Sequence, residues 1–357
     1  MNAIEIHGLS KSFGTKRAVE NLELAIPQGS LCGLIGPNGA GKTTSIRMIM
    51  SIIFPDAGTL RVLGKDSAVE SKDRIGYLPE ERGIYRKMKV GAFLKYMAGL
   101  KGLDPAGLDK KVGEWLERVG LADCAKKKCE ELSKGMQQKV QFLTTIMHAP
   151  DLIILDEPFS GLDPVNAKLL RELVLEQHRA GRTIIFSTHQ MFHAESLCDR
   201  VVMIHRGQKV LDASPREIRS RFASRLLLAE ALDPSSFPAS ERERIAGIEG
   251  VESVRQNGHE LEITAAEGRA AELLPRIASS GALRRVEVHQ PSLEDIFVEI
   301  VLGADHAGAG QDEAAEREAL RNLLRAGNNA EAEPVAAGVA GVGGVGGAGG
   351  AGGRSRG

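Results

Sequence analysis

Short apolar runs alternate with longer amphipathic segments over the first 222 residues. The runs are rich in Ile, Leu and Val without clean alternation, which is typical of strands buried on both faces. They predict strands over residues 3–7, 30–35, 74–78, 151–155, 182–187 and 201–205. Helical spacing predicts helices over residues 42–53, 90–100, 110–119, 134–148 and 164–179. This alternation indicates an α/β domain whose helices cover the sheet, with a helical subdomain inserted at about residues 88–148.

The pattern changes near residue 223. Residues 225–230 and 283–289 predict single strands, whereas residues 251–256 and 259–264 predict a hairpin about the Asn257-Gly258 turn. Helices are predicted over residues 240–245, 269–279 and 292–301. The order βαββαβ followed by a helix matches a ferredoxin-like split βαβ. We therefore expect an α/β domain at residues 1–222, an α+β accessory domain at 223–302 and a flexible tail at 303–357.

The tail is rich in Ala, Gly, Glu and Arg. Residues 313–325 predict an isolated helix, and residues 338–357 are of low complexity and predict disorder. No stretch of the chain offers the ~20 predominantly apolar residues of a membrane span, because the uncharged segment 335–351 is mostly glycine. Glu5 and His7 interrupt the N-terminal segment, so we expect no export signal and a cytoplasmic location.

Composition narrows the function further. A length of 357 residues predicts two or three folded units of ~150 residues. The chain carries 46 Lys and Arg against 47 Asp and Glu, which argues against binding nucleic acid through bulk positive charge. The four cysteines are scattered without CxxC spacing, so neither a zinc site nor a disulfide framework is expected.

The segment from Gly36 to Thr43 reads GPNGAGKT and fits the phosphate-binding pattern GxxxxGK[ST]. It follows a predicted strand and precedes a predicted helix, which is the context that this chemistry needs. The glycines let backbone N–H groups turn toward a phosphate, and the helix N-terminus adds partial positive charge. Lys42 then reaches the β/γ-phosphates, and the Thr43 hydroxyl is placed to bind Mg²⁺. The alternative is an ordinary glycine-rich turn between a strand and a helix.

Two carboxylates, Asp156 and Glu157, end the apolar strand that begins near residue 151. Asp156 can hold Mg²⁺ through water, and Glu157 can polarise the water that attacks the γ-phosphate. Alone, such a pair indicates only solvated loop charges. Downstream of a phosphate-binding loop, the catalytic interpretation is favoured.

The segment from Leu132 to Lys139 reads LSKGMQQK. Ser133 precedes a predicted helix, so it has the position of an N-cap. The same geometry offers the Ser133 hydroxyl, the Gly135 amide and a helix dipole to a second phosphate group. One chain would then carry two different phosphate-binding surfaces.

Taken together, these segments resemble the nucleotide-binding subunit of an ABC transporter. The resemblance covers residues 1 to about 220 and rests on five motifs in order: Walker A at Gly36 to Thr44, the signature at Leu132 to Lys139, Walker B at Leu152 to Glu157, a D-loop at Ser160 to Asp163, and a switch histidine, His189. It implies a head-to-tail dimer with each ATP between the Walker motifs of one subunit and the signature of the other. It also implies nucleotide contacts from Gly36, Asn38, Gly39, Gly41, Lys42, Thr43 and Thr44.

The resemblance assigns roles to three further residues. Phe13 is similar to the aromatic residue that stacks on adenine, with a core phenylalanine as the alternative. Asp163 is similar to the residue that links the two ATP sites, although before Pro164 it is also expected as an N-cap. His189 is similar to the γ-phosphate sensor, with a buried structural histidine as the alternative.

Two departures from the common motifs indicate one branch of this family. Glu80 stands where glutamine is usual; it keeps an acceptor oxygen for Mg²⁺ or water but adds negative charge. Lys134 and Met136 alter the signature, whereas Ser133 and Gly135 are retained. Both departures, and the segment PSLEDIF at residues 291–297, resemble ATPase subunits of type-2 exporters likened to sodium-extrusion and drug-resistance pumps.

This branch implies an ATP- and Mg²⁺-dependent ATPase at the inner face of the cell membrane. Its partners would be a separate transmembrane permease subunit and a second ATPase subunit, identical or not, with no nucleic acid. The alternative is a soluble ABC ATPase acting on ribosomes or nucleic acid. The single Walker A motif and the short stretch from Lys42 to Asp156 argue against it, and a P-loop kinase or GTPase would not explain residues 132–139. The transported substrate is chosen by the membrane subunit and is not readable from this chain.

Overall fold

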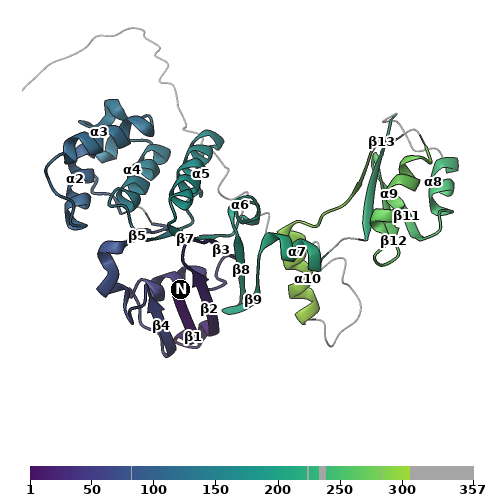
Figure 1. Cartoon of the computed structure of the whole chain (residues 1–357), viewed down its shortest axis with the longest axis horizontal. Helices are drawn as coiled ribbons and strands as arrows, with labels where there is room; N and C mark the ends of the chain where they lie inside the picture. The colour runs from purple at the N-terminus through teal and green to yellow at the C-terminus, as the bar shows by residue number, and fades with distance from the viewer. Residues whose placement is uncertain (82, 223–224, 233–238, 282, 306–357) are drawn as a thin grey trace, which may run out of the picture.

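The computed structural model describes residues 1–81, 83–222, 225–232, 239–281 and 283–305 (Figure 1). The helix predicted at 313–325 and the low-complexity segment 338–357 lie outside these residues. Among the described helices, none combines the length and the apolar character needed to cross a membrane.

A six-stranded sheet forms the centre of the first domain, in the order β5-β6-β7-β3-β8-β9. Its strands are β3 (Leu31–Ile35), β5 (Ile75–Leu78), β6 (Leu152–Asp156), β7 (Thr183–Thr188), β8 (Arg200–His205) and β9 (Gln208–Ala213). All neighbours are parallel except β8 and β9. Every residue of β3, β6 and β7 is buried, which explains their continuous apolar runs. The sequence analysis missed β9, an edge strand that is only partly buried.

A second, antiparallel sheet has the order β2-β1-β4. It consists of β1 (Asn2–Phe13), β2 (Lys16–Pro27) and β4 (Ala57–Val62). The sequence analysis found only part of β1 and missed β2 and β4. In β2, Leu22, Leu24 and Ile26 are buried between exposed residues, so the strand alternates as a one-sided sheet requires. This sheet and α1 (Lys42–Ile49) share a core with one face of the central sheet, which is therefore not covered by helices alone.

Helices cover the other face of the central sheet, where they share a second core with it. They are α2 (Val90–Leu100), α3 (Leu108–Arg118), α4 (Lys134–Ile146), α5 (Pro164–Arg179), α6 (Met191–Leu197) and α7 (Pro215–Arg221), with 3-10 turns at Ala122–Cys124 and Cys129–Glu131. A further 3-10 turn, Ala68–Arg74, belongs to the first core through Ala68. Residues 88–148 contain helices and a single isolated β-bridge between Lys89 and Lys128. The expected helical subdomain is thus present, and α2, α3 and α4 lie together beside the sheet (Figure 1).

The second unit is a four-stranded antiparallel sheet in the order β11-β12-β10-β13. Its elements are β10 (Leu226–Ala231), α8 (Ala239–Ala246), β11 (Val251–Asn257), β12 (Glu260–Ala265), α9 (Ala270–Ala278) and β13 (Leu283–Val288). In chain order this is 4-1-3-2 read from β13, the ferredoxin-like arrangement that was expected. The hairpin turn differs from the prediction by one residue: Asn257 pairs with Glu260, so the loop is Gly258-His259, with Gly258 at φ +61°.

The last described helix, α10 (Leu293–Asp305), packs on the first domain. Its buried side chains belong to the core that also holds α4, α5 and α6, namely Leu293, Ile296, Phe297, Val298 and Val301. The Phe297 ring meets the His205 ring edge-to-face at 5.5 Å. The sequence analysis grouped this helix with the accessory domain, but its apolar face is buried in the core of the first domain. Figure 1 shows the helix near α7 and far from α8 and α9. The predicted boundaries at residues 222 and 302 otherwise stay predictions.

Candidate nucleotide site

The loop between β3 and α1 can be built only with glycine at two positions. Gly36 has φ +149°, and a Cβ atom there would lie 2.1 Å from the carbonyl oxygen of Ile204. Gly41 has φ +112°, and its Cβ would lie 2.5 Å from the carbonyl oxygen of Ala18. Any side chain would force the backbone apart, so the glycines of the motif are explained by close backbone approach as well as by turn geometry.

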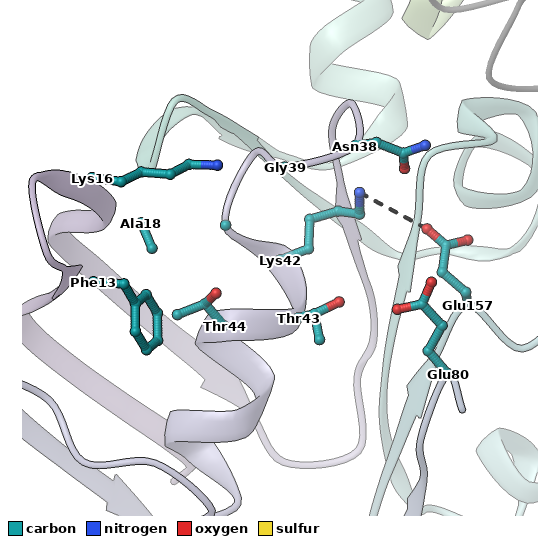
Figure 2. Close-up of a pocket in the computed structure, with 11 residues that line it drawn as sticks. Phe13, Lys16, Ala18, Asn38, Gly39, Lys42, Thr43, Thr44, Glu80 and Glu157 are labelled. Carbon is teal, nitrogen blue, oxygen red and sulfur yellow. Dashed lines mark ion pairs between the residues drawn. The ribbon is translucent and has the colours of Figure 1, made fainter. Parts of the chain in front are cut away.

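Lys42, the first residue of α1, is only 6% exposed. Its Nζ donates to the carbonyl oxygens of Gly36 at 2.8 Å and Pro37 at 3.1 Å. It lies 3.8 Å from Glu157 Oε1 (Figure 2). Burial lowers the pKa of Lys42, while the carboxylates of Glu157 and Asp156 oppose that shift. The Lys42 ammonium is thus held at the loop by two neutral carbonyl oxygens. Negatively charged phosphate oxygens can replace them as its hydrogen-bond acceptors.

A cavity of about 340 Å³ opens beside this loop. Residues from four separate parts of the chain line it (Figure 2): Phe13, Lys16, Ala18, Asn38, Gly39, Gly41, Lys42, Thr43, Thr44, Glu80 and Glu157. Lys16 and Ala18 were not identified from the sequence because the strand that carries them, β2, was missed. The alternation of apolar and polar residues along β2 was the signal that could have found it.

Three expected site residues lie directly behind this lining. Gly36 accepts from Lys42, Asp156 contacts Thr43, and His189 contacts Glu157. The carboxyl ends of β3, β6 and β7 are neighbours in the sheet, so residues more than 100 positions apart meet there. The cavity is therefore at the edge where parallel α/β sheets bind ligands.

Asp156 is buried at the end of β6 and is suited to hold a cation. Its Oδ1 accepts hydrogen bonds from Thr43 Oγ1 at 3.2 Å and from Ser187 Oγ. Its Oδ2 is buried and has no hydrogen-bond partner among the described residues. Burial raises the pKa of Asp156, so the site gains from a positive charge. A hydroxyl and a buried carboxylate beside a phosphate-binding loop fit Mg²⁺, which takes few protein oxygens and completes its shell with water and phosphate.

Glu80 faces the same cavity from the loop after β5. Burial raises the pKa of Glu80, and the nearby carboxylates of Asp156 and Glu157 raise it further. A carboxyl group in this environment is favoured as a ligand of a cation or as a hydrogen-bonded acid. The position is compatible with the expected role near Mg²⁺.

Glu157 and His189 form a buried pair, each 8% exposed. Glu157 Oε1 accepts from the His189 backbone N–H at 3.0 Å and lies 2.9 Å from His189 Nδ1. An ionised carboxylate only accepts, so Nδ1 carries the proton in this contact. The Glu157 backbone N–H donates to the Ser187 hydroxyl at 3.1 Å. Ser187 therefore contacts both Walker B acids, a role that sequence reasoning did not assign to it.

Glu157 also has a strained backbone, with φ +48°. A residue with a side chain rarely adopts this left-handed region, and strain of this kind persists only where surrounding contacts impose it. The strain turns the chain immediately after β6 and presents the carboxylate to the cavity.

Phe13 is 51% exposed and lines the cavity, so the alternative of a core phenylalanine is wrong. Lys11 Nζ lies 5.7 Å from the centroid of its ring. An exposed aromatic face at the mouth of a cavity is available for stacking.

The signature and D-loop residues do not reach this cavity. Ser133 is exposed and caps α4, with its Oγ accepting from the Met136 backbone N–H at 3.3 Å. Asp163 is exposed and caps α5 by accepting from Val165 and Asn166. Gly135 lies against the same Asn166, because a Cβ added there would be 2.9 Å from Asn166 Nδ2. These residues form a second, separate group on the surface.

Comparison with known proteins agrees with this geometry. Residues 19–160 match the family described as "ABC transporter", and residues 214–301 match "ATP-binding protein DrrA1-3-like, C-terminal domain". Residues 129–192 also match "AAA domain, putative AbiEii toxin, Type IV TA system".

Individual relatives extend the match to nearly the whole described chain. The uncharacterized ABC transporter ATP-binding protein YhaQ of Bacillus subtilis is 41% identical over 298 residues, covering 84% of this chain and 98% of YhaQ. The linearmycin resistance ATP-binding protein LnrL of the same organism is 28% identical, with 83% of this chain and 97% of LnrL covered. A solved structure of an ATP binding subunit of an ABC transporter is 30% identical with a TM-score of 0.57, over 62% of this chain and 93% of that chain. With the P-loop, the buried carboxylates and the signature segment in place, the chain belongs to the ATP-binding proteins of ABC transporters.

Proposed function

We propose that the cavity beside Lys42 binds MgATP and that Glu157 polarises the water that attacks its γ-phosphate. The chain is an ATPase whose activity is coupled to transport, as its family is. The observation that carries the assignment of residues is the buried group at one sheet edge: Lys42 Nζ lies 3.8 Å from Glu157 Oε1, which lies 2.9 Å from His189 Nδ1.

Each residue of this group has a distinct task. The Lys42 ammonium exchanges its carbonyl acceptors for β/γ-phosphate oxygens, and the backbone N–H groups of the loop surround the phosphates. Thr43 and Asp156 supply oxygen ligands for Mg²⁺, which when bound neutralises developing phosphate charge. Glu157 accepts a hydrogen bond from the attacking water, and His189 holds that carboxylate in place. Phe13 stacks on the adenine.

The signature residues would complete the site of a second subunit. Ser133 is exposed and Gly135 is partly exposed at the N-terminus of α4, where a hydroxyl, an amide N–H and the helix dipole can bind a γ-phosphate. Since they do not line the cavity of their own chain, we propose a head-to-tail dimer in which they close on the ATP bound by the partner. Asp163 lies beside them and would link the two sites.

The proposal of a membrane partner rests on the family to which the chain belongs and not on the geometry of the cavity. We propose that residues 1–222 act as the ATPase cassette and residues 223–302 as an accessory domain joined to it through α10. The cassette would dock at the inner face of the cell membrane on a separate transmembrane permease. The match of residues 214–301 to a DrrA-type domain and the similarity to LnrL support an exporter.

Substitution of Glu157 by Gln tests the central assignment. The variant keeps the size and hydrogen-bonding reach of the side chain but loses its negative charge. We expect ATP affinity to remain and steady-state turnover to fall by about 10²–10⁴-fold, the usual contribution of a general base. Gel filtration with ATP should show a trapped dimer. The control is Glu81→Gln, which makes the same change at the exposed carboxylate that follows Glu80 in the sequence. Turnover of Glu157→Gln at the level of Glu81→Gln would remove Glu157 from the mechanism.

A further inference from the structure

Phe159 anchors the strained turn that carries Glu157. It follows Glu157 by two residues and is 4% exposed. On one side its ring meets Phe186 of β7 edge-to-face at 5.8 Å. On the other side it meets the ring of His193 at 4.5 Å, tilted by 31°. The left-handed backbone at Glu157 is thus followed by a side chain fixed between two rings.

His193 is itself held in one orientation. It is 4% exposed and lies on α6, four residues after His189 in the sequence. Arg171 Nη2, from α5, lies 3.1 Å from His193 Nδ1. A guanidinium only donates, so Nδ1 accepts and the imidazole is neutral with its proton on Nε2. Burial lowers the pKa of His193 to about 4, which keeps the ring neutral near pH 7.

His193 therefore links the two chain segments that follow Glu157 and His189. Through Phe159 it contacts the segment that begins at Glu157, and through α6 it is joined to the segment that begins at His189. The 2.9 Å contact between Glu157 and His189 completes a ring of contacts and chain connections that also includes Phe159 and His193. If the His193 ring moved, the contact that joins Phe159 to α6 would be lost. The side chains of Glu157 and His189 could then move apart.

We propose that His193 is a positioning residue that sets the distance between Glu157 and His189, with Arg171 fixing its ring. The inference rests on the proposed role of Glu157. It differs from the simpler interpretation of a buried core histidine, which contributes stability alone. A core histidine predicts a variant that is less stable but whose folded fraction is fully active. A positioning residue predicts a folded enzyme that binds ATP normally and hydrolyses it slowly.

Two substitutions of His193 separate the ring from its hydrogen bond. His193→Leu removes the ring contact with Phe159 and the acceptor for Arg171. His193→Phe keeps an aromatic ring against Phe159 but loses the acceptor. His148→Leu is the matched control, because His148 is a partly buried histidine on the loop after α4 whose pKa is also lowered to about 4 by burial. It contacts the carbonyl oxygen of Ile75, away from the cavity.

The measurements are kcat and KM for ATP, the affinity for a non-hydrolysable ATP analogue, and the melting temperature of the full chain. We expect His193→Leu to lower kcat about 10- to 100-fold with KM and analogue affinity within about twofold of wild type. His193→Phe should retain more of the rate, since the wall behind Phe159 remains. His148→Leu should lower only the melting temperature.

The outcomes separate this inference from the proposed function. If Glu157→Gln is inactive but both His193 variants have the kcat of His148→Leu, the positioning role is wrong and the catalytic assignment stands. If Glu157→Gln keeps wild-type turnover, the catalytic assignment fails whatever His193 does. A parallel loss of kcat and analogue affinity in His193→Phe would mean general damage to the site and would also overturn the inference.

Discussion

The two surfaces proposed to bind phosphate, the Walker surface around Lys42 and the signature surface at Ser133 and Gly135, differ in almost every physical respect. The Walker surface is a cavity in which Lys42, Asp156 and Glu157 are each at most 8% exposed. The signature surface is an open helix end whose Ser133 side chain faces solvent. The first has charges that burial makes costly unless they are paired. The second offers a hydroxyl, an amide and a helix terminus, with the exposed Lys134 beside them.

The difference indicates which surface provides the affinity for ATP and which one acts only after ATP is bound. A buried ammonium that faces carboxylates is arranged before the nucleotide arrives, so the Walker surface can bind ATP by itself. An exposed helix N-terminus contributes little until another surface excludes water from it. The signature surface is therefore suited to sense ATP that is already bound elsewhere. Substitutions that affect one surface should leave the behaviour of the other intact.

The largest effect should come from Lys42→Met, which keeps the buried stem but removes the charge. Truncating one member of a buried charged contact loses about 2–5 kcal/mol, so the Kd for ATP should rise about 30-fold to several thousand-fold. Lys16→Met is the control, since Lys16 lines the same cavity but is exposed and should change the Kd less than about fivefold. Titration with a fluorescent ATP analogue measures both. Equal losses would mean that burial does not distinguish the two lysines.

A smaller effect, confined to turnover, should follow from Ser133→Arg. ATP binding should persist, while the bulky cation at the helix end blocks closure and lowers kcat by about tenfold or more. Ser214→Arg is the control, because it removes a comparable N-cap hydroxyl at α7. The free energy of unfolding of both variants should fall by about 1 kcal/mol.

Mixing subunits tests whether the signature acts on the partner. A Ser133→Arg subunit mixed with a Glu157→Gln subunit should retain one of two composite sites, formed by the Walker surface of the first and the signature of the second. Hydrolysis above that of either variant alone is expected. Mixed subunits in which every Ser133→Arg chain stays inactive would contradict a site shared between chains.

The smallest effect should come from Phe13→Ala. Stacking of a base on an aromatic side chain is worth about 1–3 kcal/mol. The low end applies to this half-exposed ring, so the Kd for ATP should rise about fivefold. Affinity for inorganic triphosphate, which has no base, should stay unchanged. Phe54→Ala is the matched control, because Phe54 is 74% exposed and does not line the cavity. A loss of triphosphate affinity in Phe13→Ala would refute stacking as the cause.

Much of the architecture could be predicted from the chain itself. The buried strands β3, β6 and β7 were found because residues buried on both faces form continuous apolar runs. Helix α5 was predicted with its observed bounds, since Asp163 and Pro164 form a strong start signal. The ferredoxin-like unit was found from the order of its elements. In contrast, β2, β4 and β9 were missed because their burial is one-sided or partial.

The site was predictable wherever its chemistry lies within one short segment. Asn38, Gly39, Lys42 and Thr43 follow one another in the order that the pattern requires. Lys16, Ser187 and His193 were not assigned to the site, because the motifs give these positions no role. The alternation along β2 would have predicted a strand, but not a function for Lys16. Their roles depend on contacts with distant residues, such as the Ser187 hydroxyl on Asp156 and the Arg171 guanidinium on His193.

The sequence alone determined the position of the phosphate-binding loop, because the residue pattern of the loop and the start of α1 are local properties of a few residues. Only the tertiary structure decided that β7 lies beside β3 and β6 beside β7, which brings Asp156 and His189 to the loop. It also decided that α10 packs on the first domain, and that Ser133 lies away from the cavity of its own chain. The reason is that strand order and helix packing minimise exposed apolar surface over the whole molecule, a balance that no single segment carries.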